Sequence, residues 1–134
     1  MIYLLDTNVC ITYLRGKDAL LMQRVNAQPP ADVGLCSIVL AELYYGAALS
    51  NQPAANKAKV QSFIQQFQSL PFDDSASDVF GGLRAHLVKL GTPIGPYDLM
   101  LAAIALSNRL TLVTHNTKEF SRVPRLPLAD WQVP

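Results

Sequence analysis

The sequence has few cysteines, few charges and no long apolar run, and each shortage excludes a class of protein. Its two cysteines, Cys10 and Cys36, lack the Cys-x-x-Cys spacing of zinc and redox sites and lie in apolar runs, so we expect buried thiols rather than a disulfide. Only 16% of the 134 residues are charged and 50% are hydrophobic, which excludes a disordered chain. The formal net charge of +1 gives no strong field for a polyanion, so a bound nucleic acid would need local basic patches or metal ions.

The N-terminal apolar run is short, has no basic segment before it and is broken by Asp6. It therefore predicts neither a signal peptide nor a membrane span, and we expect a cytoplasmic protein with no membrane partner. The sequence also has no Gly-rich phosphate loop and no Gly-x-Ser-x-Gly nucleophile motif. Its length predicts a single domain over residues 1–134.

Strand and helix patterns alternate along the chain. Strands are expected at 2–5, 33–36, 70–72 and 110–114, with the third at a sheet edge because of Pro71. Helices are expected at 9–14, 18–28, 38–48 (capped by Ser37), 54–68, 75–90 and 97–107. This alternation predicts an α/β fold, a three-layer α/β/α arrangement around a mainly parallel sheet.

Four polar side chains are expected to meet at one edge of that sheet, beyond the carboxyl ends of its strands. Asp6 follows the first strand and Asn116 follows the last, whereas Glu42 and Asp98 lie near the starts of two apolar helices. Each has a structural alternative: Asp6 as a helix cap, Asp98 as a favourable charge at a helix N-terminus and Asn116 as a turn residue. Glu42 is the hardest to explain structurally, because a desolvated carboxylate needs a cation, hydrogen-bond donors or a proton.

Their joint placement favours a metal site. Carboxylates gathered at one edge repel each other, and a hard divalent cation relieves the repulsion; oxygen ligands suit Mg²⁺ or Mn²⁺. Such an ion polarises phosphoryl oxygens and activates water. The residues alone therefore predict metal-assisted hydrolysis of a phosphodiester or a phosphomonoester.

Four sequence segments resemble those of PIN-domain ribonucleases, and more narrowly the VapC toxins of VapBC toxin–antitoxin systems. They are YLLDTN at 3–8, AELYYGA at 41–47, GPYDLMLAA at 95–103 and THNTKEFSRV at 114–123, with Asp130-Trp131 near the end. The resemblance covers nearly the whole chain and implies one PIN-like domain. It also implies Mg²⁺ as cofactor, with Mn²⁺ as a substitute.

The resemblance implies a role for each site residue. Asp6 and Asp98 would be the metal ligands, directly or through water, and Glu42 would complete the acidic pocket and orient the attacking water. Thr7 and Asn8 would hold the Asp6 carboxylate by hydrogen bonds. Thr114 would support the pocket floor.

One position departs from the pattern of the family. Many PIN domains carry a fourth acid where this chain has Asn116, which can position water but adds no charge. Glu119, three residues later, is expected to supply the missing charge, and one metal is expected rather than two.

The resemblance further implies an endoribonuclease toxin that cuts loops of tRNA or ribosomal RNA and so blocks translation. Its partners would be an RNA substrate, a VapB-like antitoxin and a second copy of itself in a homodimer. Operator DNA would be bound only through the antitoxin.

The near-neutral chain would hold RNA through local basic residues and exposed tyrosines. The basic candidates are Arg15, Lys17, Arg84, His86, Lys89, Lys118, Arg122 and Arg125. Tyr44, Tyr45 and Tyr97 are candidates to stack unpaired bases, although the interpretation favoured by their apolar neighbours places them in the core.

Two other functions stay open on the residues alone. A phosphatase of the haloacid-dehalogenase type also begins with an Asp after its first strand, but it needs a second acid where Asn8 stands. A non-catalytic receiver-like binding module would use Asp73 or Asp74 as its acceptor.

Overall fold

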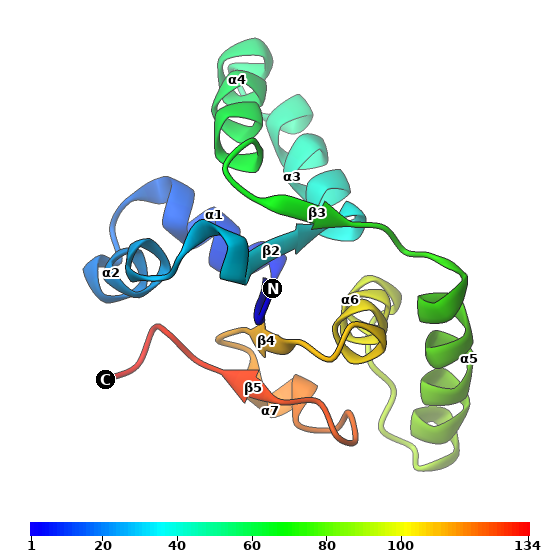
Figure 1. Cartoon of the computed structure of the whole chain (residues 1–134). Coiled ribbons are helices and arrows are strands. Elements are labelled where there is room, and N and C mark those ends of the chain that lie inside the picture. The colour runs from blue at the N-terminus through cyan, green and yellow to red at the C-terminus, as the bar shows by residue number, and fades with distance from the viewer.

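The computed structural model describes all of residues 1–134, and a five-stranded sheet lies at its centre (Figure 1). The strands are β1 (Tyr3–Leu5), β2 (Val33–Cys36), β3 (Gln68–Leu70), β4 (Thr111–Val113) and β5 (Leu128–Ala129). Every neighbouring pair is parallel, in the order β3-β2-β1-β4-β5. The α/β fold predicted from the sequence is therefore confirmed.

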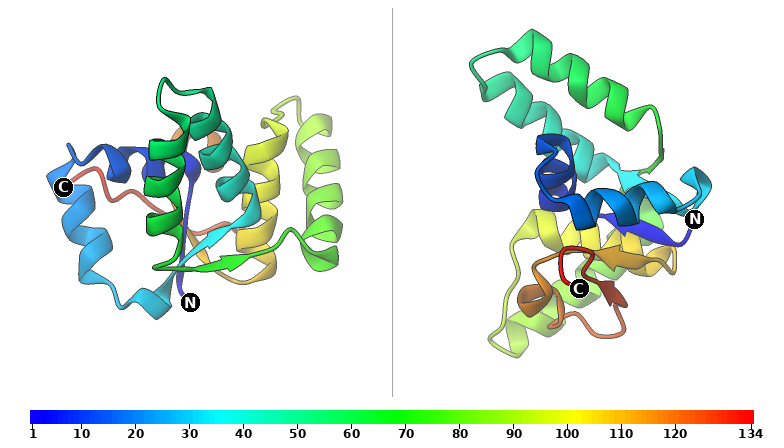
Figure 2. Two further views of the ribbon diagram at one scale, coloured as in Figure 1. Left: turned by 90° about the horizontal axis from the view of Figure 1, so that it is seen from above. Right: turned by 90° about the vertical axis from the view of Figure 1, so that its left-hand side faces the viewer.

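Helices join the strands and cover both faces of the sheet. They are α1 (Thr7–Arg15), α2 (Ala19–Ala27), the 3-10 turn η1 (Pro30–Asp32), α3 (Ser37–Leu49), α4 (Pro53–Ile64), α5 (Asp74–Lys89), α6 (Pro96–Ser107) and α7 (Thr117–Phe120). Helices α1 and α2 lie on one side of the sheet and α5 and α6 on the other, while α3 and α4 form a pair that projects beyond it (Figures 1 and 2).

The order of the strands determines where a ligand site can form. The chain moves outward from β1 through β2 to β3, then crosses back to place β4 on the other side of β1. The connections leaving β1 and β4 at their carboxyl ends therefore diverge, and this reversal opens the crevice in which open parallel sheets bind ligands. The carboxyl ends of β1 and β4 are the ends that carry Asp6 and Asn116.

The core explains why α6 is nearly apolar all round. A cluster of 28 buried residues includes Leu99, Leu101, Ala102, Ile104 and Ala105 of this helix. Pro96 occupies its first turn, where a missing N–H costs nothing. The two cysteines are buried, free thiols, as predicted.

Several predicted element boundaries differ from the structure. Helix α1 starts at Thr7 rather than at residue 9, and α4 ends at Ile64 rather than at 68. Ser37 is not a cap, because it is the first residue of α3 and its hydroxyl points to Leu70 O, 3.5 Å away.

The edge strand and the last segment also differ from the prediction. The edge strand lies at 68–70 rather than 70–72, so Pro71 falls just outside it. Neither α7 nor β5 was predicted, because four and two residues are too few to form a periodic pattern. None of the helices combines the length and apolar character required to cross a bilayer.

Gly81 and Gly91 differ in backbone conformation, and this difference predicts opposite effects of alanine at the two positions. Gly91 has φ of +72° and its N–H donates to Val88 O, while Thr92 N–H donates to Leu87 O, so it ends α5 in a left-handed turn. Gly81 lies inside the same helix with open space around it.

We predict that Gly91→Ala lowers the free energy of unfolding by about 1 kcal/mol, whereas Gly81→Ala raises it by about 0.5–1 kcal/mol. Urea denaturation measures both, and changes of the same sign would contradict this assignment.

Candidate active site

Asp6 lies at the junction of β1 and α1. Its backbone N–H donates to Val113 O of β4 at 3.1 Å, which joins the carboxyl ends of the two central strands. Its carboxylate caps α1 by accepting a 2.7 Å hydrogen bond from Val9 N–H. The side chain is only 4% exposed. Asp6 is thus the helix cap that its structural alternative predicted, and it is also a buried carboxylate at the ends of the two central strands.

Glu42 extends from α3 toward the same edge. The hydroxyl of Thr7 donates to Glu42 Oε1 at 2.7 Å, so the residue that follows Asp6 holds a carboxylate from a helix 35 positions away. The expectation that Thr7 and Asn8 hold the Asp6 carboxylate is therefore wrong in its detail. Val9 N–H and the Thr114 side chain are the donors to Asp6, and Asn8 is exposed on α1.

The loop after β4 contributes a linked set of polar groups. Thr114 is fully buried, and its hydroxyl oxygen accepts a 3.0 Å hydrogen bond from Asn116 N–H. Asn116 Nδ2 in turn donates to Glu119 Oε2 at 2.8 Å. Asn116 thus acts on the carboxylate of Glu119, which lies in the first turn of α7.

Asp98, in the first turn of α6, is the residue on which these charges converge. Burial, followed by the negative charges of Glu119, Glu42 and Asp6, raises the pKa of Asp98 to about 6. Electrostatic coupling of this kind weakens with distance, so Glu119, Glu42 and Asp6 each lie near enough to Asp98 to affect its pKa. Glu119 has the largest effect of the three charges on the pKa of Asp98.

Asp6 has a raised pKa for the same reasons. Burial is the largest cause, and the charges of Glu42 and Asp130 add to it. The hydrogen bonds from Thr114 and Val9 act in the opposite direction and lower the pKa. Burial, followed by the charge of Asp6, also raises the pKa of the Cys10 thiol, so this cysteine is not an available nucleophile.

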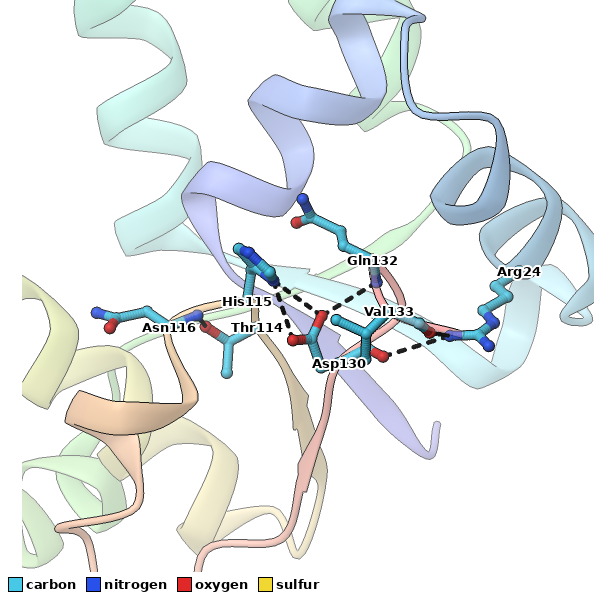
Figure 3. A network of polar contacts seen from close by, with 7 residues as sticks. All are labelled: Arg24, Thr114, His115, Asn116, Asp130, Gln132 and Val133. Atoms are coloured by element: carbon cyan, nitrogen blue, oxygen red, sulfur yellow. Dashed lines mark hydrogen bonds and ion pairs between the residues drawn. The ribbon is translucent and has the colours of Figure 1, made fainter.

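None of the four carboxylates has a cationic partner. The single contact of the structure between a basic side chain and a carboxylate joins His115 Nδ1 to Asp130 Oδ2 at 2.9 Å. Figure 3 shows this pair next to Thr114 and Asn116. The backbone N–H of Gln132 also donates to Asp130, and Arg24 donates to Val133 O at 2.6 Å, which holds the C-terminal segment in place. No cationic side chain of the protein therefore offsets the repulsion among Asp6, Glu42, Asp98 and Glu119.

Sequence reasoning missed the part played by Asp130. In the structure His115 pairs with Asp130, and Glu119 accepts a hydrogen bond from Asn116. Asp130 raises the pKa of Asp6 and is thus a fifth acid close to the site. No local pattern signals it, since it reaches the site only because β5 pairs with β4.

The oxygen donors suit a hard divalent cation, but they do not enclose one. No three Asp, Glu, His or Cys side chains are close enough together to form a metal site by themselves. Mg²⁺ is commonly bound in this way, by one or two carboxylates while it keeps several waters. The uncompensated carboxylates therefore fit a partly hydrated ion rather than one held in an all-protein cage.

Comparison with known proteins identifies the family. Residues 3–126 match the family described as PIN domain. Over 129 residues, 96% of this chain and 97% of the relative, the sequence is 40% identical to the tRNA(fMet)-specific endonuclease VapC of Salmonella typhimurium. It is 36% identical to Ribonuclease VapC2 of Rickettsia felis, with 98% of each chain covered. The chain belongs to the VapC family of PIN-domain proteins.

The solved structures agree with this assignment. The crystal structure of DNA-bound VapBC from Salmonella typhimurium contains a chain that matches with a TM-score of 0.93 and 40% identity, over 98% of both chains. The PIN-like fold and VapC family membership predicted from the four sequence segments are thus confirmed.

The raised pKa of Asp98 predicts how the metal-free protein responds to pH. A carboxyl that ionises less readily in the folded state contributes stability below its unfolded pKa and loses it as the pH rises through about 6. Asp98→Asn removes that loss, and since the side chain is half-buried we expect a melting temperature about 2–5 °C higher at pH 7.5. At pH 4 the variant and the parent should melt together. A variant less stable than the parent at pH 7.5, measured in EDTA, would contradict the assigned electrostatics.

Proposed function

We propose that this protein is an Mg²⁺-dependent endoribonuclease that acts as the toxin of a toxin–antitoxin pair and hydrolyses RNA phosphodiester bonds. The observation that carries the proposal is the set of four coupled carboxylates without a cationic partner at the carboxyl ends of β1 and β4. Such a set lowers stability unless a cation is bound, so it is explained by a function rather than by folding. The names of the VapC relatives, an endonuclease and a ribonuclease, support RNA as the substrate.

Asp6 and Asp98 are the residues that we assign to the metal. When bound, Mg²⁺ polarises a phosphoryl oxygen and makes hydroxide available near neutral pH. Asp6 is fixed for this task by Val9 N–H and Thr114, whose hydrogen bonds favour its ionised form. Asp98 has a pKa of about 6 in the metal-free protein, so it is mostly ionised at neutral pH and a nearby positive charge favours its ionised form further.

The other residues position water and charge. Thr7 occupies Oε1 of Glu42 and so orients its carboxylate, which we assign to holding the attacking water. Asn116 holds Glu119 in the same way, and Thr114 holds the backbone N–H of Asn116. Arg122 Nη1 donates to Pro93 O at 3.3 Å, on the loop that leads into α6, and we assign Arg122 to a substrate phosphate.

The substrate class that we propose is structured RNA with an exposed loop, with tRNA ahead of ribosomal RNA because the Salmonella typhimurium relative is named as specific for tRNA(fMet). The partner is a VapB-like antitoxin, as in the solved VapBC complexes, and operator DNA is bound through that antitoxin. We further propose that the chain acts as one PIN-like domain, as a homodimer and in the cytoplasm.

Neither alternative function gains support from the geometry. Asn8, where a phosphatase of the haloacid-dehalogenase type needs its second acid, is exposed on α1 and not part of the carboxylate set. Asp73 caps α5 by accepting from Ala76 N–H, next to the edge strand β3, whereas a receiver needs an acceptor after a central strand.

Replacement of single carboxylates tests the mechanism. Asp6→Asn and Asp98→Asn should each lower cleavage of unfractionated tRNA by about a hundred-fold or more at saturating Mg²⁺, because each removes a carboxylate that we assign to holding the metal. Both variants should keep the circular dichroism spectrum of the parent. Asp78→Asn, which removes an exposed acid of α5, is the matched control and should cut at the parental rate.

EDTA should stop the parental activity and Mg²⁺ or Mn²⁺ should restore it. Parental cleavage rates in both Asp6→Asn and Asp98→Asn, or undiminished cleavage in EDTA, would reject the metal-dependent mechanism.

A further inference from the structure

A pocket adjoins the carboxylate set on the side of α3. It has a volume of about 510 Å³, within the range of small-molecule sites, and is lined by Ile38, Ala41, Glu42, Tyr45 and Tyr97. The first four of these residues follow the i, i+3, i+4, i+7 spacing and so form one face of α3. Tyr97 faces them from the first turn of α6, immediately before Asp98.

The two tyrosines of this pocket are unusual among those of the chain. Tyr3, Tyr13 and Tyr44 are partly buried and pack against the hydrophobic core. Tyr45 and Tyr97 are 67% and 61% exposed, and both line this one pocket. The expectation that the tyrosines belong to the core is therefore wrong for Tyr45 and Tyr97. Folding does not explain two exposed aromatic rings beside a site whose substrate is proposed to be RNA.

We propose that this Tyr45–Tyr97 pocket binds one unpaired nucleobase of the RNA next to the bond that is cut. This inference rests on the proposed function. Glu42 belongs both to the pocket and to the carboxylate set. A base in the pocket and a phosphate at Asp6 and Asp98 would therefore belong to the same nucleotide or to adjacent ones.

The chemistry of the walls selects a base rather than a phosphate. Four of the five lining residues are hydrophobic or aromatic, and the one charged group is the carboxylate of Glu42, which repels phosphate. A nucleobase is planar, neutral and able to stack on tyrosine rings, and it enters such a pocket only when it is not paired. The pocket thereby selects loops and single strands over duplex RNA.

The test uses the full chain in the Asp98→Asn background, which binds without cutting, with Mg²⁺ present. The probe is a single-stranded RNA dodecamer carrying 2-aminopurine, and its base-paired duplex is the second probe. Tyr45→Ala and Tyr97→Ala should each weaken binding of the single strand by about 5- to 100-fold and reduce the quenching of 2-aminopurine, since each removes a stacking ring. Duplex binding should not change.

Two controls separate stacking from other roles. Tyr45→Phe and Tyr97→Phe keep the rings and should bind like the parent. Leu49→Ala removes a side chain that is 72% exposed on the same helix but outside the pocket, and it should have no effect.

Each other outcome overturns the inference. If both tyrosine-to-alanine variants bind the single strand normally while the parent with intact Asp98 cuts RNA, the pocket is not a base site and the proposed function stands. If the alanine variants instead change the oligomeric state or antitoxin binding with RNA affinity unchanged, the pocket is a protein interface. If the parent neither binds nor cuts RNA, the proposed function fails and the pocket assignment falls with it.

Discussion

The repulsion among Asp6, Glu42, Asp98 and Glu119 is the constraint on which the account of this structure depends. These groups lie close enough for three of them to raise the pKa of the fourth, and no lysine, arginine or histidine neutralises any of them. Desolvation adds to the same effect, because a buried carboxylate loses hydration that the protein replaces only in part. The fold therefore holds an electrostatic strain that a bound cation would relieve, and the strain is confined to one edge of the sheet.

The topology of the sheet explains why the strain gathers there. The crossover from β3 to β4 makes β1 and β4 neighbours whose following segments diverge, and Asp6 N–H to Val113 O joins their ends. Glu42 on α3 and Asp98 in the first turn of α6 then extend toward the same crevice. Hydrogen bonds from Thr7 to Glu42 and from Asn116 to Glu119 fix two of the carboxylates, so the site is organised before a metal or a substrate binds.

Much of this arrangement could be read from the sequence, because its determinants are local. Apolar runs that end in a carboxylate, the all-apolar pattern of α6 and Pro96 at its start predicted the fold and the positions of Asp6 and Asp98. The contacts that could not be read depend on tertiary packing. Asp130 reaches Asp6 only through the two-residue strand β5, and Thr7 holds Glu42 rather than Asp6 because of the way α3 packs against α1. The exposure of Tyr45 and Tyr97 likewise depends on how α3 and α6 pack in the folded chain, rather than on their apolar neighbours in sequence.

The most direct measurement of the central claim is a pH titration of the Asp98 side-chain carboxyl by ¹³C NMR, without metal and then with Mg²⁺. The account predicts a midpoint near pH 6 in the metal-free protein, a lower midpoint in Glu119→Gln, and a further fall when Mg²⁺ is added. A midpoint near the ordinary value of 3.8 that neither the substitution nor the ion changes would show that the carboxylates are not coupled, and would contradict the account.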